Sequence, residues 1–169
     1  MNRNIRKLTV AAMIAAVYLV LTMIFYVTSF QPLQSRLAEA LAVLPYFTPV
    51  AIPGLFVGCI LANIIGGNGI WDVVVGSLSS LLAAYLTYKL TYNKPKRKWL
   101  APLPAVLVNA VVVGIMLSVL ANNTTITSLF VNILLVGLGQ LLACYVLGFP
   151  LMLLIERTKK INELFKEIS

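Results

Sequence analysis

The chain has 169 residues, of which 60% are hydrophobic and 11% are charged. A soluble domain carries about 25% charged residues, so the composition excludes an ordinary soluble protein and predicts a single integral membrane domain over residues 1–169. The net charge of +8 could suit nucleic acid. However, the basic residues form short clusters beside apolar segments, which is the pattern of cytoplasmic loops. We expect a multi-pass plasma-membrane protein with no nucleic-acid partner.

A membrane-spanning helix needs about 20 apolar residues, and several segments of the chain approach or exceed that length. Apolar segments lie at about 8–30, 33–44, 50–65, 70–92, 100–121 and 126–155. Gly66-Gly67-Asn68-Gly69 and the polar residues 122–125 mark turns between them. The second segment is short and is followed by Pro45. The sequence predicts an all-α, six-transmembrane-helix bundle with a short, broken second helix.

Three basic clusters set the predicted topology, at residues 3–7, 94–98 and 157–160. If all three stay in the cytoplasm, an even number of spans separates each pair, and six helices satisfy both conditions. Both termini are then cytoplasmic. The second segment cannot cross about 30 Å unaided, so irregular backbone at 45–49 is expected at membrane depth. Such backbone requires cover by protein or a water-filled cavity.

Arg36 and Glu39 are charged residues within the short second segment. A charge at the centre of a spanning helix costs about 2.5–3.5 kcal/mol on insertion scales, so such residues pair or serve a function. Their spacing of three places both on one helical face. Three alternatives stay open: an ion pair between them, an ion pair of Arg36 with Asp72, and direct contact with a substrate.

Other polar residues interrupt the apolar segments. Asp72 shares a predicted face with Gly76, Ser79, Ser80 and Ala83, and Gln140 shares one with Gly137, Cys144 and Gly148. The small residues favour close helix packing. For Asp72 and Gln140, a structural role and contact with a ligand are equally consistent with the sequence. Asn63 and Asn109 could bond across helices or read the edge of a ligand. Tyr46 and Trp71 could anchor at the interface or cap a pocket.

Two kinds of chemistry are absent from the sequence. The chain has no histidine, so no metal site and no catalytic triad are expected, and Cys59 and Cys144 are interpreted as packing residues. There is no phosphate-binding loop for ATP. We therefore expect neither an enzyme nor a resident cofactor, and uphill transport would need an ion gradient or an energised partner.

Alanines in the first segment have a spacing that suits close helix contact. Ala11, Ala12, Ala15 and Ala16 form two overlapping Ala-x-x-x-Ala pairs, which would let another helix approach closely. The spacing does not say whether that helix belongs to this chain or to a partner.

These features together resemble the QueT family, substrate-binding (S) components of energy-coupling factor (ECF) transporters. The resemblance lies in Arg-Leu-Ala-Glu-Ala-Leu at 36–41, Leu-Pro-Tyr-Phe-Thr-Pro at 44–49, Pro-Gly-Leu at 53–55, Cys-Ile-Leu-Ala-Asn at 59–63, Asp72 and Gly76-Ser77. It implies uptake of a queuosine precursor, meaning a 7-deazaguanine such as the 7-cyano or 7-aminomethyl compound, or queuine. It also implies a membrane-embedded T component and two ATPase subunits as partners, with the alanine face of the first helix docking on the T component.

The candidate residues suit such a ligand. A carboxylate can accept from the ring N–H and the amino group of a deazaguanine together, and Glu39 is the expected acceptor. Arg36, Asn109 or Gln140 could donate to the ring carbonyl, and Asp72 could face a protonated aminomethyl group. Tyr46 or Trp71 could stack on the ring. The alternative is a stand-alone, proton-coupled secondary transporter of a small heterocycle, with Glu39 or Asp72 carrying the proton.

Overall fold

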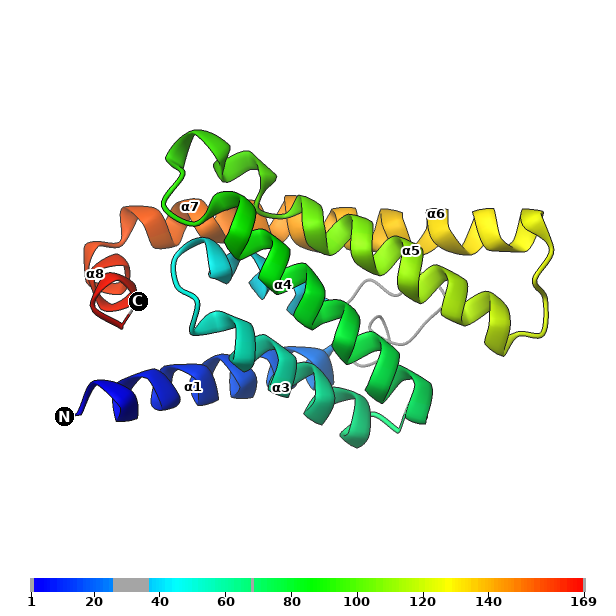
Figure 1. The fold of residues 1–169 in the computed structure, drawn as a ribbon, viewed down its shortest axis with the longest axis horizontal. Coiled ribbons are helices and arrows are strands. Elements are labelled where there is room, and N and C mark those ends of the chain that lie inside the picture. The colour runs from blue at the N-terminus through cyan, green and yellow to red at the C-terminus, as the bar shows by residue number, and fades with distance from the viewer. Residues whose placement is uncertain (1, 26–36, 68, 169) are drawn as a thin grey trace.

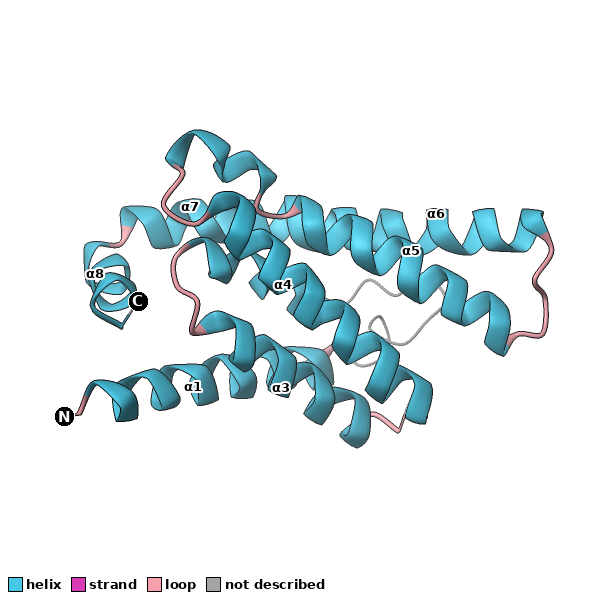
Figure 2. Ribbon diagram, viewed as in Figure 1, coloured by secondary structure: helices cyan, strands magenta, loops and turns pink. Residues whose placement is uncertain are grey.

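A computed structural model describes residues 2–25, 37–67 and 69–168, so Arg36 lies outside the described residues. Every secondary-structure element in the described part of the chain is helical (Figure 2). The α-helices are α1 (Arg3–Ile24), α3 (Ala51–Ile65), α4 (Ser77–Thr91), α5 (Leu103–Leu120), α6 (Ile126–Leu141), α7 (Phe149–Arg157) and α8 (Lys159–Ile168). Tighter 3₁₀ segments occupy Leu37–Tyr46 and Pro95–Leu100, and wider π-helical turns occupy Asp72–Gly76 and Leu142–Gly148.

Four of the helical segments that the structure describes are long and apolar enough to cross a membrane: Arg3–Ile24, Asp72–Thr91, Pro95–Leu120 and Ile126–Arg157. Leu37–Tyr46 and Ala51–Ile65 are shorter apolar helices of 10 and 15 residues. The all-α prediction is therefore confirmed, whereas the count of six spans stays a prediction.

The second segment differs in detail from the sequence-based expectation. We expected a helix over about 33–44 that stops at Pro45, but Pro45 lies inside a 3₁₀ helix that ends at Tyr46. The following bend is stabilised by local hydrogen bonds. The Leu44 carbonyl accepts from the amides of Phe47 and Thr48, at 2.9 and 3.3 Å, and the Thr48 hydroxyl oxygen accepts from the Val50 amide at 3.3 Å. This bend therefore satisfies much of its own backbone, which reduces its need for water.

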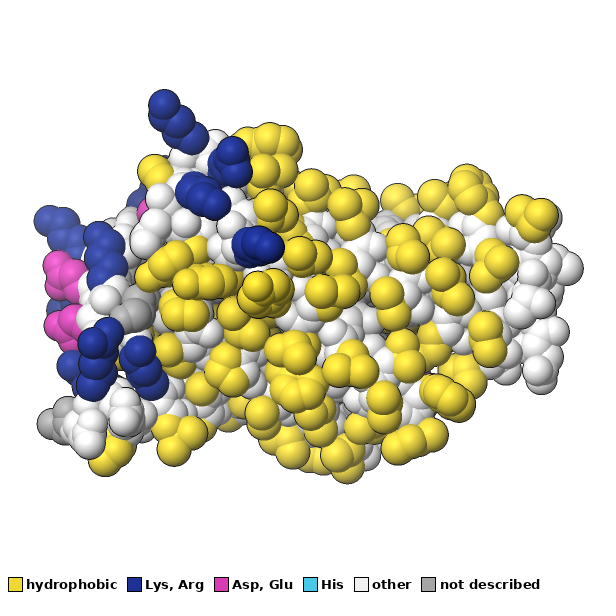
Figure 3. All heavy atoms as spheres, in the orientation of Figure 1, with side chains coloured by type: hydrophobic (Ala, Val, Ile, Leu, Met, Phe, Trp, Pro, Cys, Tyr) yellow, Lys and Arg dark blue, Asp and Glu magenta, His cyan; other side chains and the backbone are white. Residues whose placement is uncertain are grey.

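The two ends of the molecule differ in charge. The N terminus and α8 lie at the same end (Figure 1), where Arg6 and Glu167 form an ion pair of 2.9 Å. Lys and Arg side chains gather at this end on the face drawn in Figure 3. Hydrophobic side chains cover the middle of that face, and the opposite tip shows mainly other side chains and backbone. Helix α8 is seen nearly end-on in Figure 1 and therefore lies across the other helices. We call this end of the molecule the basic end; that it is cytoplasmic stays a prediction.

Helix α1 packs on α3 through glycines that admit the opposing backbone. A Cβ added at Gly54 would meet the Ala11 carbonyl oxygen at 2.8 Å, and one at Gly58 would meet the Ala15 carbonyl oxygen at 3.0 Å. The Ala11/Ala15 pair is therefore used within the chain. Ala12 and Ala16, in contrast, are exposed on α1.

Replacing Gly54 by Ala should destabilise the α1–α3 contact, because the new methyl meets a backbone atom that cannot rotate away. We expect a loss of about 1–3 kcal/mol in the free energy of unfolding, as for other overpacked sites. The measurement is reversible unfolding in detergent micelles. Gly137→Ala is the matched control, since its Cβ would meet only the Ala110 methyl, at 3.3 Å. Equal stability of the two variants would contradict the packing argument.

Candidate functional site

A carboxylate lies at the centre of a polar network in the interior of the bundle. Glu39 is only 2% exposed. Its Oε1 accepts a hydrogen bond of 2.7 Å from the Tyr18 hydroxyl on α1 and one of 3.3 Å from the Ser80 hydroxyl on α4. Among the described residues, no hydrogen bond falls on Oε2. The protein thus uses one carboxylate oxygen and leaves acceptor capacity on the other.

One branch of the network runs from Ser80 towards Asp72. Ser80 Oγ lies 3.5 Å from Cys59 Sγ on α3. The Asn63 amide, one turn further along α3, donates to Cys59 Sγ at 3.5 Å and to the backbone oxygen of Asp72 at 2.8 Å. Asn63 therefore ties α3 to the first residue of the π-helical turn before α4.

A second branch reaches α5 and α6. Cys144 Sγ lies 3.5 Å from the backbone oxygen of Glu39 and 3.7 Å from Gln140 Oε1. Gln140 Oε1 also accepts from the Asn109 amide at 3.2 Å. Polar groups from α1, α3, α4, α5 and α6, from both π-helical turns and from the 3₁₀ helix thus form one connected network.

Within the described part of the chain, some polar atoms near this network have no hydrogen-bond partner. They are Asn63 Oδ1, Asn109 Oδ1 and Ser77 Oγ, all of them buried. Buried polar groups are normally paired, and leaving one unpaired costs about 1–3 kcal/mol. The two amide oxygens are acceptors, as is Glu39 Oε2. This set of groups suits a guest that brings several N–H donors.

Backbone irregularities position two members of the network. The sequence predicts uninterrupted helices around Asp72 and Cys144, but both residues lie in π-helical turns. Such turns shift the helix face that follows and often occur at functional sites. Gly148 lets the second turn approach the 3₁₀ helix closely, since a Cβ there would meet the Ala40 carbonyl oxygen at 2.8 Å. That approach brings Cys144 beside Glu39.

The structure brings most of the predicted site residues into this network: Glu39, Asn63, Asp72, Asn109 and Gln140, all buried. Asp72 joins it through its backbone oxygen. Tyr46 is not among them, because it lies at the basic end, where its hydroxyl donates to Glu156 Oε1 at 3.2 Å. Trp71 is 57% exposed and borders an apolar groove along α5. The predicted role of Arg36 falls outside the described residues.

Sequence reasoning missed Tyr18, and it treated Cys59, Cys144 and Ser80 as packing residues. The two cysteines are fully buried, as expected of packing residues, but each is also a member of one branch. Cys59 lies between Ser80 and Asn63, and Cys144 lies between Glu39 and Gln140. One signal could have identified Tyr18. Its hydroxyl lies inside a long apolar helix, where the bilayer offers no water to satisfy it.

The network offers binding chemistry. Among the described residues, no group of three His, Cys, Asp or Glu side chains could hold a metal ion. A buried carboxylate beside unpaired amide oxygens can instead recognise a neutral or cationic heterocycle by accepting its N–H groups.

Comparisons with known proteins identify the family to which the chain belongs. A family model described as "QueT transporter" matches residues 8–157. A relative named "Queuosine precursor transporter QueT", from Lactococcus lactis subsp. cremoris (strain MG1363), is 34% identical over 73 residues. That alignment covers 42% of this chain and 43% of the relative, so the match spans under half of each protein. No solved structure matches the chain.

A double-mutant cycle of Tyr18→Phe and Glu39→Gln should reveal direct coupling. Tyr18→Phe removes the donor of a buried hydrogen bond, and Glu39→Gln removes the negative charge of its acceptor. Hydrogen bonds to charged groups typically contribute about 1.5–3 kcal/mol. We expect the paired changes to cost about 1–2 kcal/mol less than the sum of the single changes. Unfolding in detergent micelles measures all four species. Additive costs would mean that the 2.7 Å contact contributes nothing to stability.

Proposed function

Because the chain belongs to the QueT transporter family, we propose that it binds a queuosine precursor of the 7-deazaguanine class inside the membrane as the receptor subunit of an uptake system. The protein is a multi-pass protein of the cell membrane. The observation that carries the proposal is the buried Glu39 carboxylate, held on Oε1 by Tyr18 and Ser80.

The ligand class follows from the unsatisfied acceptors. A 7-deazaguanine has a ring N–H and an amino group on one edge, and a carboxylate accepts from both. Asn63 Oδ1 and Asn109 Oδ1 are further acceptors for ring or substituent N–H groups. The Gln140 amide would donate to the ring carbonyl, and the Asp72 carboxylate would favour a protonated aminomethyl group.

The uptake system would be of the energy-coupling factor type, with a T component and two ATPase subunits. In this proposal the chain forms six spans with both termini in the cytoplasm, and the short segments Leu37–Tyr46 and Ala51–Ile65 belong to its second and third spans. The partner would dock on Ala12 and Ala16, since these residues are exposed while Ala11 and Ala15 face α3. Small side chains there let a partner helix approach closely.

Glu39→Gln should weaken binding of 7-aminomethyl-7-deazaguanine and of its 7-cyano analogue at least about tenfold, because hydrogen bonds to a charged group contribute about 1.5–3 kcal/mol. Isothermal titration calorimetry on purified protein measures this. Glu163→Gln on the exposed side of α8 is the matched control, since it removes the same charge far from the network. Unchanged affinity in Glu39→Gln would remove Glu39 from the binding site.

Ala12→Leu with Ala16→Leu should reduce ATP-driven uptake by proteoliposomes that contain the T component and the ATPase subunits, while leaving ligand affinity unchanged. The added side chains would hold the partner helix away from α1. Ala121→Leu, at an exposed alanine after α5, is the control. Accumulation driven by a proton gradient in liposomes that hold this chain alone would instead support the secondary transporter.

A further inference from the structure

A cavity of about 340 Å³ opens at the basic end, away from the Glu39 network. It lies between the end of the 3₁₀ helix Leu37–Tyr46, the loop after α4, the end of α7, and α8. Its lining consists of Tyr46, Phe47, Asn93, Lys94, Pro95, Glu156, Asn162 and Lys166. Phe165 of α8 stacks on Phe47 with ring centroids 5.7 Å apart, which holds α8 against the end of the bundle.

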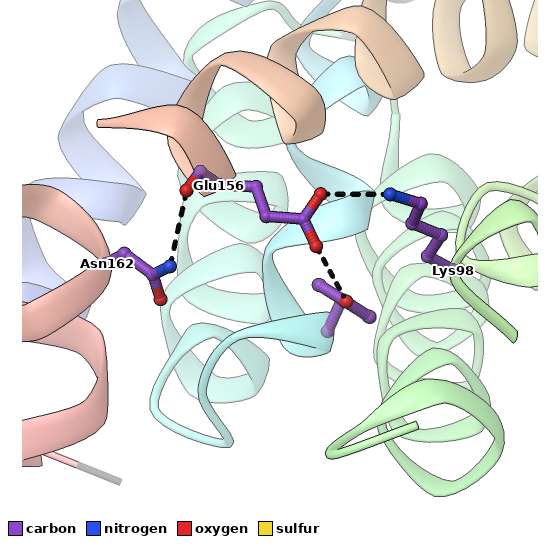
Figure 4. A network of polar contacts seen from close by, with 4 residues as sticks. Lys98, Glu156 and Asn162 are labelled. Carbon is purple, nitrogen blue, oxygen red and sulfur yellow. Dashed lines mark hydrogen bonds and ion pairs between the residues drawn. The ribbon is translucent and has the colours of Figure 1, made fainter. Parts of the chain in front are cut away.

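The acidic residue of this lining is already compensated. Figure 4 shows the Glu156 carboxylate beside Lys98, whose ammonium lies 3.1 Å away. The other carboxylate oxygen accepts from the Tyr46 hydroxyl at 3.2 Å. The Asn162 amide donates to the Glu156 backbone oxygen at 3.4 Å. Since Lys98 neutralises Glu156, this carboxylate does little to repel an anion.

Two lysines supply the remaining charge of the cavity. Lys94 and Lys166 line it from opposite elements, the loop after α4 and α8. Within the described part of the chain neither forms an ion pair, and the Lys94 ammonium donates to the Lys89 backbone oxygen at 3.0 Å. Asn93 adds an amide next to Lys94 at a turn with a left-handed φ of 55°. The lining is therefore cationic, with amide donors beside the ammonium groups.

Aromatic side chains indicate the depth of the cavity. Trp99 is 58% exposed and directly follows Lys98, and its backbone oxygen accepts from the Tyr145 hydroxyl at 3.2 Å. Exposed Trp and Tyr side chains mark the headgroup level of a membrane protein. Basic pockets at this level bind phosphorylated lipid headgroups.

We propose that this cavity binds a phosphate group through the ammonium groups of Lys94 and Lys166 and the side-chain amide of Asn93. Because Trp99 marks the level of the lipid headgroups, the favoured ligand is the phosphate of an anionic phospholipid in the adjacent leaflet. A soluble phosphate compound presents the same chemistry. The QueT match ends at residue 157, so Lys166 lies outside the part of the chain that the family model matches.

The test compares the full chain with Lys94→Gln/Lys166→Gln and with Lys159→Gln/Lys160→Gln. Both pairs remove two positive charges at the same end, but Lys159 and Lys160 do not line the cavity. Native mass spectrometry in detergent measures retention of phosphatidylglycerol against phosphatidylcholine of the same chain length. A parallel thermal-shift series with inorganic phosphate tests a soluble source. No deazaguanine is present, so the result is independent of the proposed transport function.

We expect phosphatidylglycerol to bind the native chain and the Lys159/Lys160 variant in preference to phosphatidylcholine. The Lys94/Lys166 variant should bind it about 25-fold more weakly, because each of the two lysines contributes about fivefold to the affinity for an anionic headgroup. Stabilisation by phosphate that only the Lys94/Lys166 variant loses, without lipid preference, would support the site with a soluble ligand. Equal behaviour of the two variants in both assays would overturn the proposal.

Discussion

A carboxylate buried in the apolar part of a membrane protein must find hydrogen-bond donors, and Glu39 obtains them from helices that are distant in sequence. Tyr18 reaches it from α1 and Ser80 from α4, while Cys144 contacts its backbone from the π-helical turn after α6. Because lipid offers no alternative donors, these helices must meet around one point. The convergence fixes the interior of the bundle and places the candidate binding groups together.

Close helix packing makes this convergence possible. Gly54 and Gly58 admit the backbone of α1, and Gly148 admits the backbone at Ala40 beside Glu39. Small residues at such contacts let polar side chains span the short distance between helices. Packing and polar bonding are thus two parts of one arrangement. The two alanine pairs of α1 differ in the same way. Ala11 and Ala15 face α3, whereas Ala12 and Ala16 are exposed.

The polar groups of the molecule divide into two regions with different chemistry. The interior network is rich in acceptors and has one well-buried carboxylate at its centre. The cavity at the basic end is rich in ammonium groups, and Lys98 neutralises its acidic residue. The 3₁₀ helix Leu37–Tyr46 connects the two regions. It carries Glu39 near its start and ends at Tyr46, whose hydroxyl donates to Glu156. A donor-rich heterocycle suits the first region and a phosphate the second.

The sequence by itself determined the membrane class, the all-α fold, the approximate helix bounds and the buried polar faces. The spacing of Asp72, Ser79, Ser80 and Ala83 predicts that they share one face of the fourth segment, and all four are buried in the structure. Only the tertiary structure decided which polar residues meet. Tyr46 was a candidate beside Glu39 but lies at the basic end, and Tyr18 was not a candidate although it donates to Glu39. Periodicity fixes the face of a helix that a side chain occupies. The hydrogen-bond partners of that side chain depend instead on how separate helices cross and on π-helical turns, which the local sequence pattern does not predict.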